Sequence, residues 1–91
     1  MINENSIPYL PRGVRLREDK IRGAWFLLAP ERAVRLDPIA VAILRLLDGK
    51  RPFSAIVDTL AQTYNAPRDQ IATDAAGLIS GLCDKRLLEL T

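Results

Sequence analysis

The residues that could carry out chemistry in this chain are few. The sequence has no histidine and one cysteine, Cys83, so the proton-transfer and nucleophilic pairs that rely on histidine are absent. These residues also provide too few ligands for a zinc or iron–sulfur site within this chain alone. Cys83 has no basic residue placed firmly beside it, which favours a small packed residue over a reactive thiol. We therefore expect a protein that is not an enzyme, with no catalytic residue, no metal and no cofactor.

The charged side chains are unevenly distributed along the chain. The net charge is +2, but residues 1–51 hold ten Lys and Arg against six Asp and Glu, whereas residues 52–91 hold three against five. Half of the basic residues of the first part lie close together: Arg12, Arg15, Arg17, Lys20 and Arg22. Such a cluster could steer an acidic ligand, although a solvated strand face explains it equally well.

Short strands are predicted in the first third of the chain. Residues 1–10 are polar and irregular and predict a flexible tail. Residues 11–17 alternate between apolar and polar side chains, and residues 33–36 form a short third strand after Ala24–Ala29. Because Ala24–Ala29 is apolar on both faces, either both faces are covered by other elements or one of them is an exposed binding surface.

A helix-start signal follows directly after the third strand. The Asp37 side chain can accept a hydrogen bond from the first helical turn, and Pro38 suits the first helical position. Gly49 can take the left-handed conformation that ends a helix. The apolar residues between these signals recur at helical spacing: Ile39, Ala40, Ile43, Leu44 and Leu47. We expect this helix to be covered on almost every side.

Two more helices complete the predicted fold. Residues 53–64 repeat apolar side chains at helical spacing up to the cap residue Asn65, and a third helix begins near Pro67. The apolar stripe of the third helix consists of Ile71, Ala75, Leu78 and Leu82, with Ile79 beside them. The sequence thus predicts an α+β, winged helix–turn–helix-like single domain over residues 11–91, with an N-terminal three-stranded sheet followed by three helices.

Two glycines interrupt the third helix. Gly77 and Gly81 lie four residues apart and form one smooth strip. Close approach of another backbone would explain them, but tolerated drift on a solvent-facing surface is the favoured interpretation because helix propensity is a weak constraint.

Two classes of function fit such a fold. In a winged helix–turn–helix DNA-binding regulator the third helix reads the bases, but here it carries Asp69, Asp74 and Asp84 and its basic residues lie only at its ends. DNA binding is therefore the minor alternative. The main hypothesis is a peptide-binding module, in which an extended peptide adds as a strand to an open sheet edge. The sequence does not indicate which strand edge is open.

The chain resembles the PqqD family of pyrroloquinoline quinone (PQQ) biosynthesis from residue 11 to residue 90. The resemblance rests on the order and spacing of five segments, which are PRGVRLRED, RGAWFLLAPERAVRLD, AILRLLDG, IVDTLAQTY and ATDAAGLISGL. It implies a non-catalytic peptide chaperone, the founding type of the recognition elements for ribosomally made, modified peptides (RiPP recognition elements). Such proteins bind the precursor peptide and present it to a radical S-adenosylmethionine (SAM) enzyme, which cross-links a Glu and a Tyr within it.

The resemblance also implies where the peptide lies. In this family the precursor forms a strand along the third strand, beside the third helix. Here these positions are Ala33, Val34, Arg35, Leu36, Ile71, Asp74, Ala75 and Leu78. The precursor is generally acidic, which gives the basic first half of the chain a possible role.

The remaining expectations concern location and assembly. The longest apolar run, residues 39–44, is far too short to span a membrane, and no secretory signal is visible. A single cysteine suits a reducing cytoplasm, so we expect a cytoplasmic protein with neither membrane nor nucleic-acid partners. A long hairpin with two apolar faces could exchange between protomers, so a homodimer is possible at high concentration.

Overall fold

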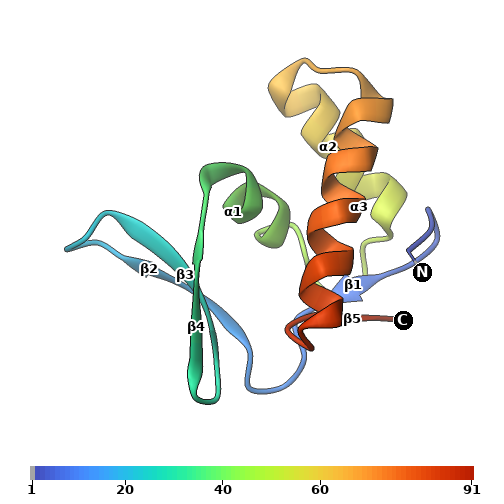
Figure 1. Cartoon of the computed structure of the whole chain (residues 1–91). Coiled ribbons are helices and arrows are strands. Elements are labelled where there is room, and N and C mark those ends of the chain that lie inside the picture. Colours follow the sequence, from blue (N-terminus) through green and yellow to red (C-terminus); the bar gives the residue numbers. More distant parts are fainter. Residues whose placement is uncertain (1) are drawn as a thin grey trace.

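A three-stranded antiparallel sheet and three helices make up most of the fold (Figure 1). The computed structural model describes residues 2–91. The sheet contains β2 (Arg15–Asp19), β3 (Ala24–Ala29) and β4 (Arg32–Leu36), and the helices are α1 (Pro38–Leu44), α2 (Phe53–Tyr64) and α3 (Arg68–Asp84). The predicted order of three strands followed by three helices is confirmed. A second sheet pairs the two-residue strands β1 (Pro8–Tyr9) and β5 (Glu89–Leu90).

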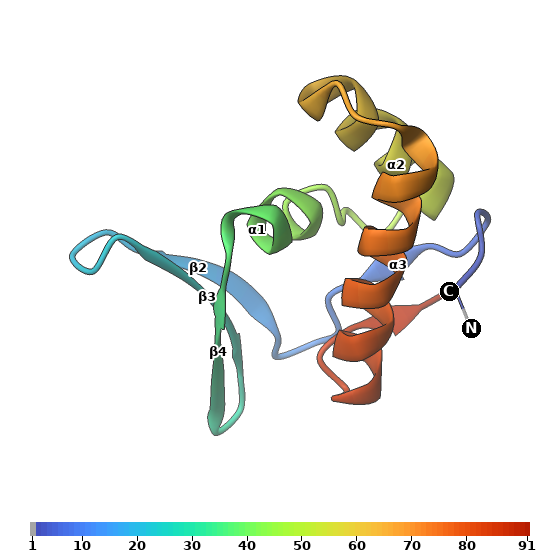
Figure 2. The ribbon, with the colours of Figure 1, turned by 45° about the horizontal axis from the view of Figure 1, so that its top comes forward.

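The three-stranded sheet is a meander with β3 at its centre. β2 and β4 each pair with β3 alone, and the register places Leu27 opposite both Leu16 and Val34. These three side chains face the helices, and Leu27 is fully buried. Pro30 and Glu31 form the tight connection between β3 and β4, with Glu31 at φ 64°. In Figure 2 the tip of the β2–β3 hairpin projects away from the helices.

Helix α1 begins as predicted but is shorter than predicted. Asp37 Oδ1 accepts a hydrogen bond from the Ala40 amide at 2.7 Å, and Pro38 occupies the first turn. The helix ends at Leu44, and the amides of Leu46 and Leu47 bond three residues back, in turn geometry. The sequence pattern does not reveal this change because Leu46 and Leu47 are good helix formers.

The expectation that α1 is covered on almost every side is wrong. Ile43 and Leu44 are buried at 2% exposure each, but Ile39 is 61% exposed. The sheet covers one side of the helix and α2 another, which leaves the side around Ile39 open. Apolar character indicates that a residue can be buried, and the neighbouring elements decide whether it is.

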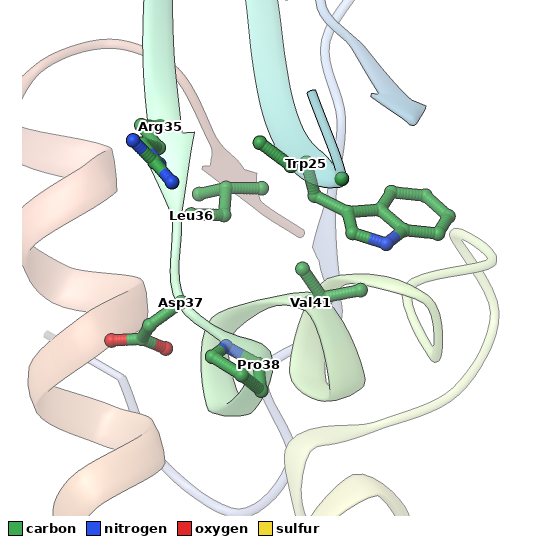
Figure 3. Close-up of a pocket in the computed structure, with 8 residues that line it drawn as sticks. Trp25, Arg35, Leu36, Asp37, Pro38 and Val41 are labelled. Carbon is green, nitrogen blue, oxygen red and sulfur yellow. The ribbon is translucent and has the colours of Figure 1, made fainter. Parts of the chain in front are cut away.

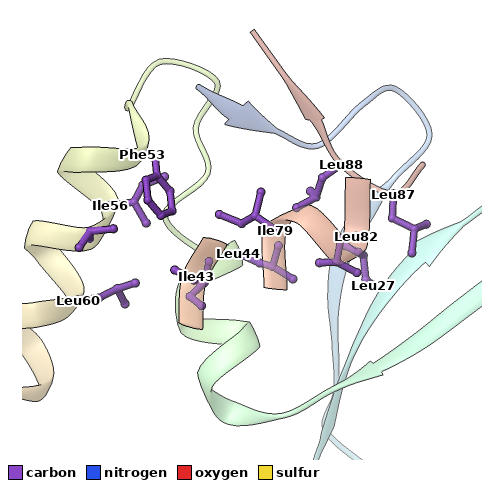
Figure 4. Close-up of a cluster of buried hydrophobic side chains, with 12 residues drawn as sticks. Leu27, Ile43, Leu44, Phe53, Ile56, Leu60, Ile79, Leu82, Leu87 and Leu88 are labelled. Atoms are coloured by element: carbon purple, nitrogen blue, oxygen red, sulfur yellow. The ribbon is translucent and has the colours of Figure 1, made fainter. Parts of the chain in front are cut away.

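Helices α2 and α3 pack against each other and form the main core with α1 and β3 (Figure 4). Asn65 ends α2 in the left-handed conformation at φ 50°, as expected from its position before Pro67. On α3 the buried residues are Ala75, Ile79 and Leu82, whereas Ile71 and Leu78 are only half-buried. The buried side of α3 is thus rotated relative to the predicted stripe, and Ile71 and Leu78 lie at its margin.

The N-terminal segment is part of the fold, in contrast to the expected tail. Pro8 is buried, and β1 pairs with β5 at the other end of the sequence. The carbonyls of Ser6 and Glu4 accept hydrogen bonds from the Phe53 and Ser54 amides, at 2.7 and 3.1 Å. These carbonyls satisfy first-turn amides of α2, whose cap residue, Pro52, has no side-chain acceptor. None of the helices in residues 2–91 is long and apolar enough to cross a membrane.

Candidate functional site

The edge of β4 is the first element of the candidate site. Within the described residues β4 pairs with β3 on one side and with no strand on the other. A two-residue connection such as Pro30–Glu31 normally closes on a hydrogen-bonded pair, here Ala29 and Arg32. Because the ladder then alternates, the backbone groups of Val34 and Leu36 also face β3. The amides and carbonyls of Ala33 and Arg35 face away from the sheet and are open to another strand.

Helix α3 is the second element of the site. Figures 1 and 2 both show α3 running alongside β4, with α1 at one end of the space between them. At the other end, Arg32 Nη2 donates a hydrogen bond to the Lys85 carbonyl at 2.6 Å. This bond joins the start of β4 to the C-terminal end of α3.

The four predicted residues of β4 fall into two pairs, one exposed and one packed against the core. Ala33 and Arg35 are exposed. Val34 and Leu36 are half-buried and pack against the core. Only Ala33 and Arg35 thus present free backbone groups, and the other two fix the position of the strand.

The predicted residues of α3 share one side of the helix, as their spacing requires. Asp74 is exposed, Ile71 and Leu78 are half-buried, and Ala75 is buried at 1% exposure. Three of them, Ile71, Asp74 and Ala75, line a hollow of about 240 Å³ between α1, α2 and α3. The structure therefore brings these three together and leaves Leu78 outside this hollow.

Sequence reasoning missed the other walls of this hollow. The residues that complete it are Ile39, Ile43, Leu60, Tyr64 and Gln70. Ile39 and Tyr64 are 61% and 49% exposed, two of the three exposed large hydrophobic residues of the described chain. Both belong to the apolar helical patterns of their helices, and helical spacing does not separate a core position from the wall of an open hollow. The hollow is largely apolar, with the Asp74 carboxylate among its few polar groups.

A second hollow, of about 710 Å³, lies where β4 meets α1 (Figure 3). In this view the side chains of Arg35 and Asp37 lie nearer to α3, and the Trp25 side chain lies on the side away from α3. Trp25 lies beneath Arg45, whose guanidinium carbon is 5.8 Å from the ring centroid. The β4 residues Arg35 and Leu36 line this second hollow, so the two groups of predicted residues belong to neighbouring hollows separated by the start of α1.

The described chain offers little reactive chemistry near these hollows. No group of three or more His, Cys, Asp or Glu side chains in residues 2–91 could hold a metal ion. Burial raises the pKa of the half-buried Cys83 thiol, and the neighbouring Asp84 carboxylate adds to this rise. A thiol with a raised pKa stays protonated at neutral pH, which suits a packed residue. What the site provides is backbone hydrogen-bonding groups and apolar walls.

The geometry does not favour the DNA-binding alternative. A recognition helix needs a solvent-facing surface that attracts phosphate. On α3 the exposed residues include Asp69, Asp74 and Asp84. Phosphates would be repelled along most of this helix.

Comparison with known proteins identifies the family of this chain. The family described as "Coenzyme PQQ synthesis protein D (PqqD)" matches residues 24–88. The chain belongs to the PqqD family. The "PqqA binding protein" of Rhodopseudomonas palustris (strain BisB5) is 48% identical over 87 residues, which cover 96% of this chain and 85% of that protein.

Two solved structures of PqqD proteins resemble this one. One is the solution NMR structure of the PqqD truncation of Methylobacterium extorquens PqqCD, described as a functional, stand-alone RiPP recognition element. It has a TM-score of 0.85 and 46% identity, covering 98% of this chain and 95% of that chain. The other is the crystal structure of PqqD from Xanthomonas campestris, with a TM-score of 0.62 and 43% identity, covering 98% and 99%. Both support the α+β fold of this chain.

Proposed function

We propose that this chain is a non-catalytic peptide chaperone of PQQ biosynthesis. It binds the ribosomal precursor peptide by strand addition to β4. It then presents the peptide to the radical SAM enzyme that cross-links a Glu and a Tyr within it. The observation that carries the proposal is the unpaired edge of β4, which runs alongside α3 and ends at two hollows with apolar walls.

Backbone pairing supplies the general part of the affinity. Ala33 and Arg35 offer two amides and two carbonyls to an added strand, and each hydrogen bond contributes about 0.5–1.5 kcal/mol net. These bonds hold an extended peptide but do not select its sequence. Selectivity must come from side chains.

The hollow beside Ile39 supplies the part of the affinity that depends on the peptide sequence. It lies near the end of α1 that follows β4, so a peptide that leaves β4 beyond Leu36 reaches Ile39 and then α3. An apolar peptide side chain placed there covers Ile39 and Tyr64, which are otherwise exposed. Burial of apolar area contributes about 25 cal/mol per Å².

The charges of the chain suit an acidic precursor. Arg35 adjoins the second hollow, and no ion pair within residues 2–91 involves it. Its electrostatic contribution to binding decreases as the salt concentration rises.

Calorimetric titration with a synthetic precursor peptide tests the proposal. An unrelated acidic peptide of equal length is the control for charge alone. We expect saturable one-to-one binding of the precursor and none of the control at physiological salt. Equal binding of both peptides would reduce the interaction to electrostatic attraction and contradict the proposal.

A further inference from the structure

The sheet has a second surface, on the side turned away from the core. The register places Arg17, Phe26 and Arg35 in one row across the three strands, and Arg15, Leu28 and Ala33 in the next. Since residues opposite each other in a sheet share a face, these six side chains project from the same side. We call them the outer sheet face.

The centre of the outer sheet face is apolar and separate from the core. Phe26 and Leu28 are half-buried, and neither belongs to the hydrophobic cluster that packs around Leu27. Together with the residues of the β2–β3 connection they line a hollow of about 660 Å³. Ile21, in that connection, is 98% exposed. The apolar surface therefore continues from the strands into the tip of the hairpin.

Arginine side chains flank this apolar centre. Arg15 and Arg17 lie on one side of it and Arg35 on the other, all exposed, and none forms an ion pair within residues 2–91. The carboxylate of Asp19 is already engaged. It accepts hydrogen bonds from the amides of Ile21 and Arg22 and lies 3.7 Å from the Arg22 guanidinium. Glu18 also lines this hollow, but the outer sheet face itself contributes only arginines, unpaired among the described residues, around an aromatic and an aliphatic residue.

This composition fits a protein partner. Protein interfaces combine a dry apolar and aromatic centre with arginine and a polar rim. A nucleic-acid backbone would use the arginines but would leave Leu28 and Ile21 exposed to water. The complementary surface is an apolar spot surrounded by carboxylates.

We propose that the outer sheet face docks an acidic surface of the enzyme that modifies the bound peptide, an inference that rests on the proposed function. β2 lies two strand spacings, about 10 Å, from the unpaired edge of β4. An enzyme can therefore hold β2 and β3 while the peptide occupies the β4 edge. The two partners bind at the same time, as presentation of a peptide requires.

Two matched double variants test this docking surface. Arg15→Gln with Arg17→Gln removes two positive charges from the outer sheet face and leaves Arg35 in place. Lys50→Gln with Arg51→Gln removes two positive charges from the loop between α1 and α2, where these residues form no ion pair among the described residues either. Affinity for the purified radical SAM enzyme of the pathway is measured by biolayer interferometry, and affinity for the precursor peptide by calorimetry. Circular dichroism verifies the fold of each variant.

We expect the Arg15 and Arg17 double variant to bind the enzyme about tenfold more weakly, with the loss mainly in the association rate and smaller at high salt. Its affinity for the peptide stays unchanged. The Lys50 and Arg51 double variant keeps its affinity for both partners. Phe26→Thr weakens enzyme binding without reducing the effect of salt, because it removes apolar contact only.

Each contrary result has its own meaning. If the peptide binds but the two double variants bind the enzyme equally, the docking surface is wrong and the proposed function stands. If the Arg15 and Arg17 double variant also loses the peptide, the outer sheet face holds the peptide, and enzyme docking there is refuted. If the native chain binds no peptide, the proposed function fails and this inference fails with it.

Discussion

Arg32 Nη2 lies 2.6 Å from the carbonyl oxygen of Lys85, which joins the first residue of β4 to the end of α3. The bond crosses 53 residues of sequence and joins β4 to α3 at the end away from α1. The carbonyls at a helix C-terminus carry partial negative charge and lack partners within the helix. A guanidinium is therefore well suited to this position, and the bond links the start of β4 to the end of α3.

The first prediction concerns this bond. Arg32→Ala should weaken peptide binding several-fold, because the distance between strand and helix is no longer fixed. The loss of stability should be about 0.5–1.5 kcal/mol, the value of one hydrogen bond at an exposed site. Calorimetry and urea unfolding measure the two effects. Lys50→Ala removes one positive charge from an exposed residue outside the basic cluster that forms no ion pair among the described residues, and it should change neither quantity.

The second prediction compares two isoleucines of α1. Ile43→Ala should reduce the free energy of unfolding by about 2–5 kcal/mol, because Ile43 is buried among α2 and α3 residues. Ile39→Ala should cost less than about 1 kcal/mol, because Ile39 is largely exposed, but it should weaken peptide binding. Urea unfolding and calorimetry separate the two outcomes. Equal destabilisation by both changes would mean that Ile39 belongs to the core.

The contrast between Ile43 and Ile39 shows how much of the structure of α1 the sequence predicts. The start of α1 is local information, because Asp37, Pro38 and the Ala40 amide lie within four residues. The sides of α1 that are covered depend on the placement of α2, α3 and the sheet. The sequence therefore predicted the helix and its cap, and could not predict the open side at Ile39.

The same reasoning applies to the ends of the chain and to the site. Pro8–Tyr9 is too short to show a periodic pattern, and it pairs with residues about eighty positions away. Family resemblance pointed to the third strand, and Ala33 and Arg35 lie on it at the edge of the sheet. It could not place Tyr64, because the hollow that Tyr64 lines exists only after three helices have packed.

The third prediction concerns the two glycines of α3. A Cβ atom added at Gly77 or Gly81 meets no other atom within 4 Å, so there is no close backbone approach to protect. Gly77→Ala and Gly81→Ala should each stabilise the protein by about 0.5–1 kcal/mol, through the higher helix propensity of alanine. Thermal unfolding measures the gain. Loss of peptide or enzyme binding would show instead that this strip contacts a partner.

The fourth prediction concerns the pairing of the chain ends at high pH. The Tyr9 hydroxyl donates a 2.6 Å hydrogen bond to the Glu89 carboxylate, and this bond is the main cause of a raised Tyr9 pKa. The folded state thus favours the protonated phenol, so its contribution is full below pH 10 and is lost as the pH rises through the raised pKa. Stability should decrease above pH 10 more steeply in the native chain than in Tyr9→Phe. Identical pH profiles would contradict a role for this bond.

The fifth prediction tests strand addition at β4. The Arg35 amide faces away from β3, whereas the Val34 amide faces β3, as argued from the hairpin register. Arg35→Pro should therefore remove one backbone donor that β4 offers to the added strand and leave the sheet intact, since proline is tolerated on the open side of an edge strand. Val34→Pro should break the ladder to β3 and destabilise the fold. Arg35→Ala keeps the backbone donor and should weaken binding only modestly.

Circular dichroism and calorimetry on the three variants separate backbone pairing from side-chain effects. Strand addition requires that Arg35→Pro folds like the native chain and loses most of its peptide affinity. Amide chemical-shift changes on adding the peptide should concentrate at residues 33–36 and 71–78. If Arg35→Pro and Arg35→Ala weaken binding equally, the side chain and not the backbone carries the interaction. Shifts confined to residues 56–64 would place the peptide on α2, away from the open edge of β4.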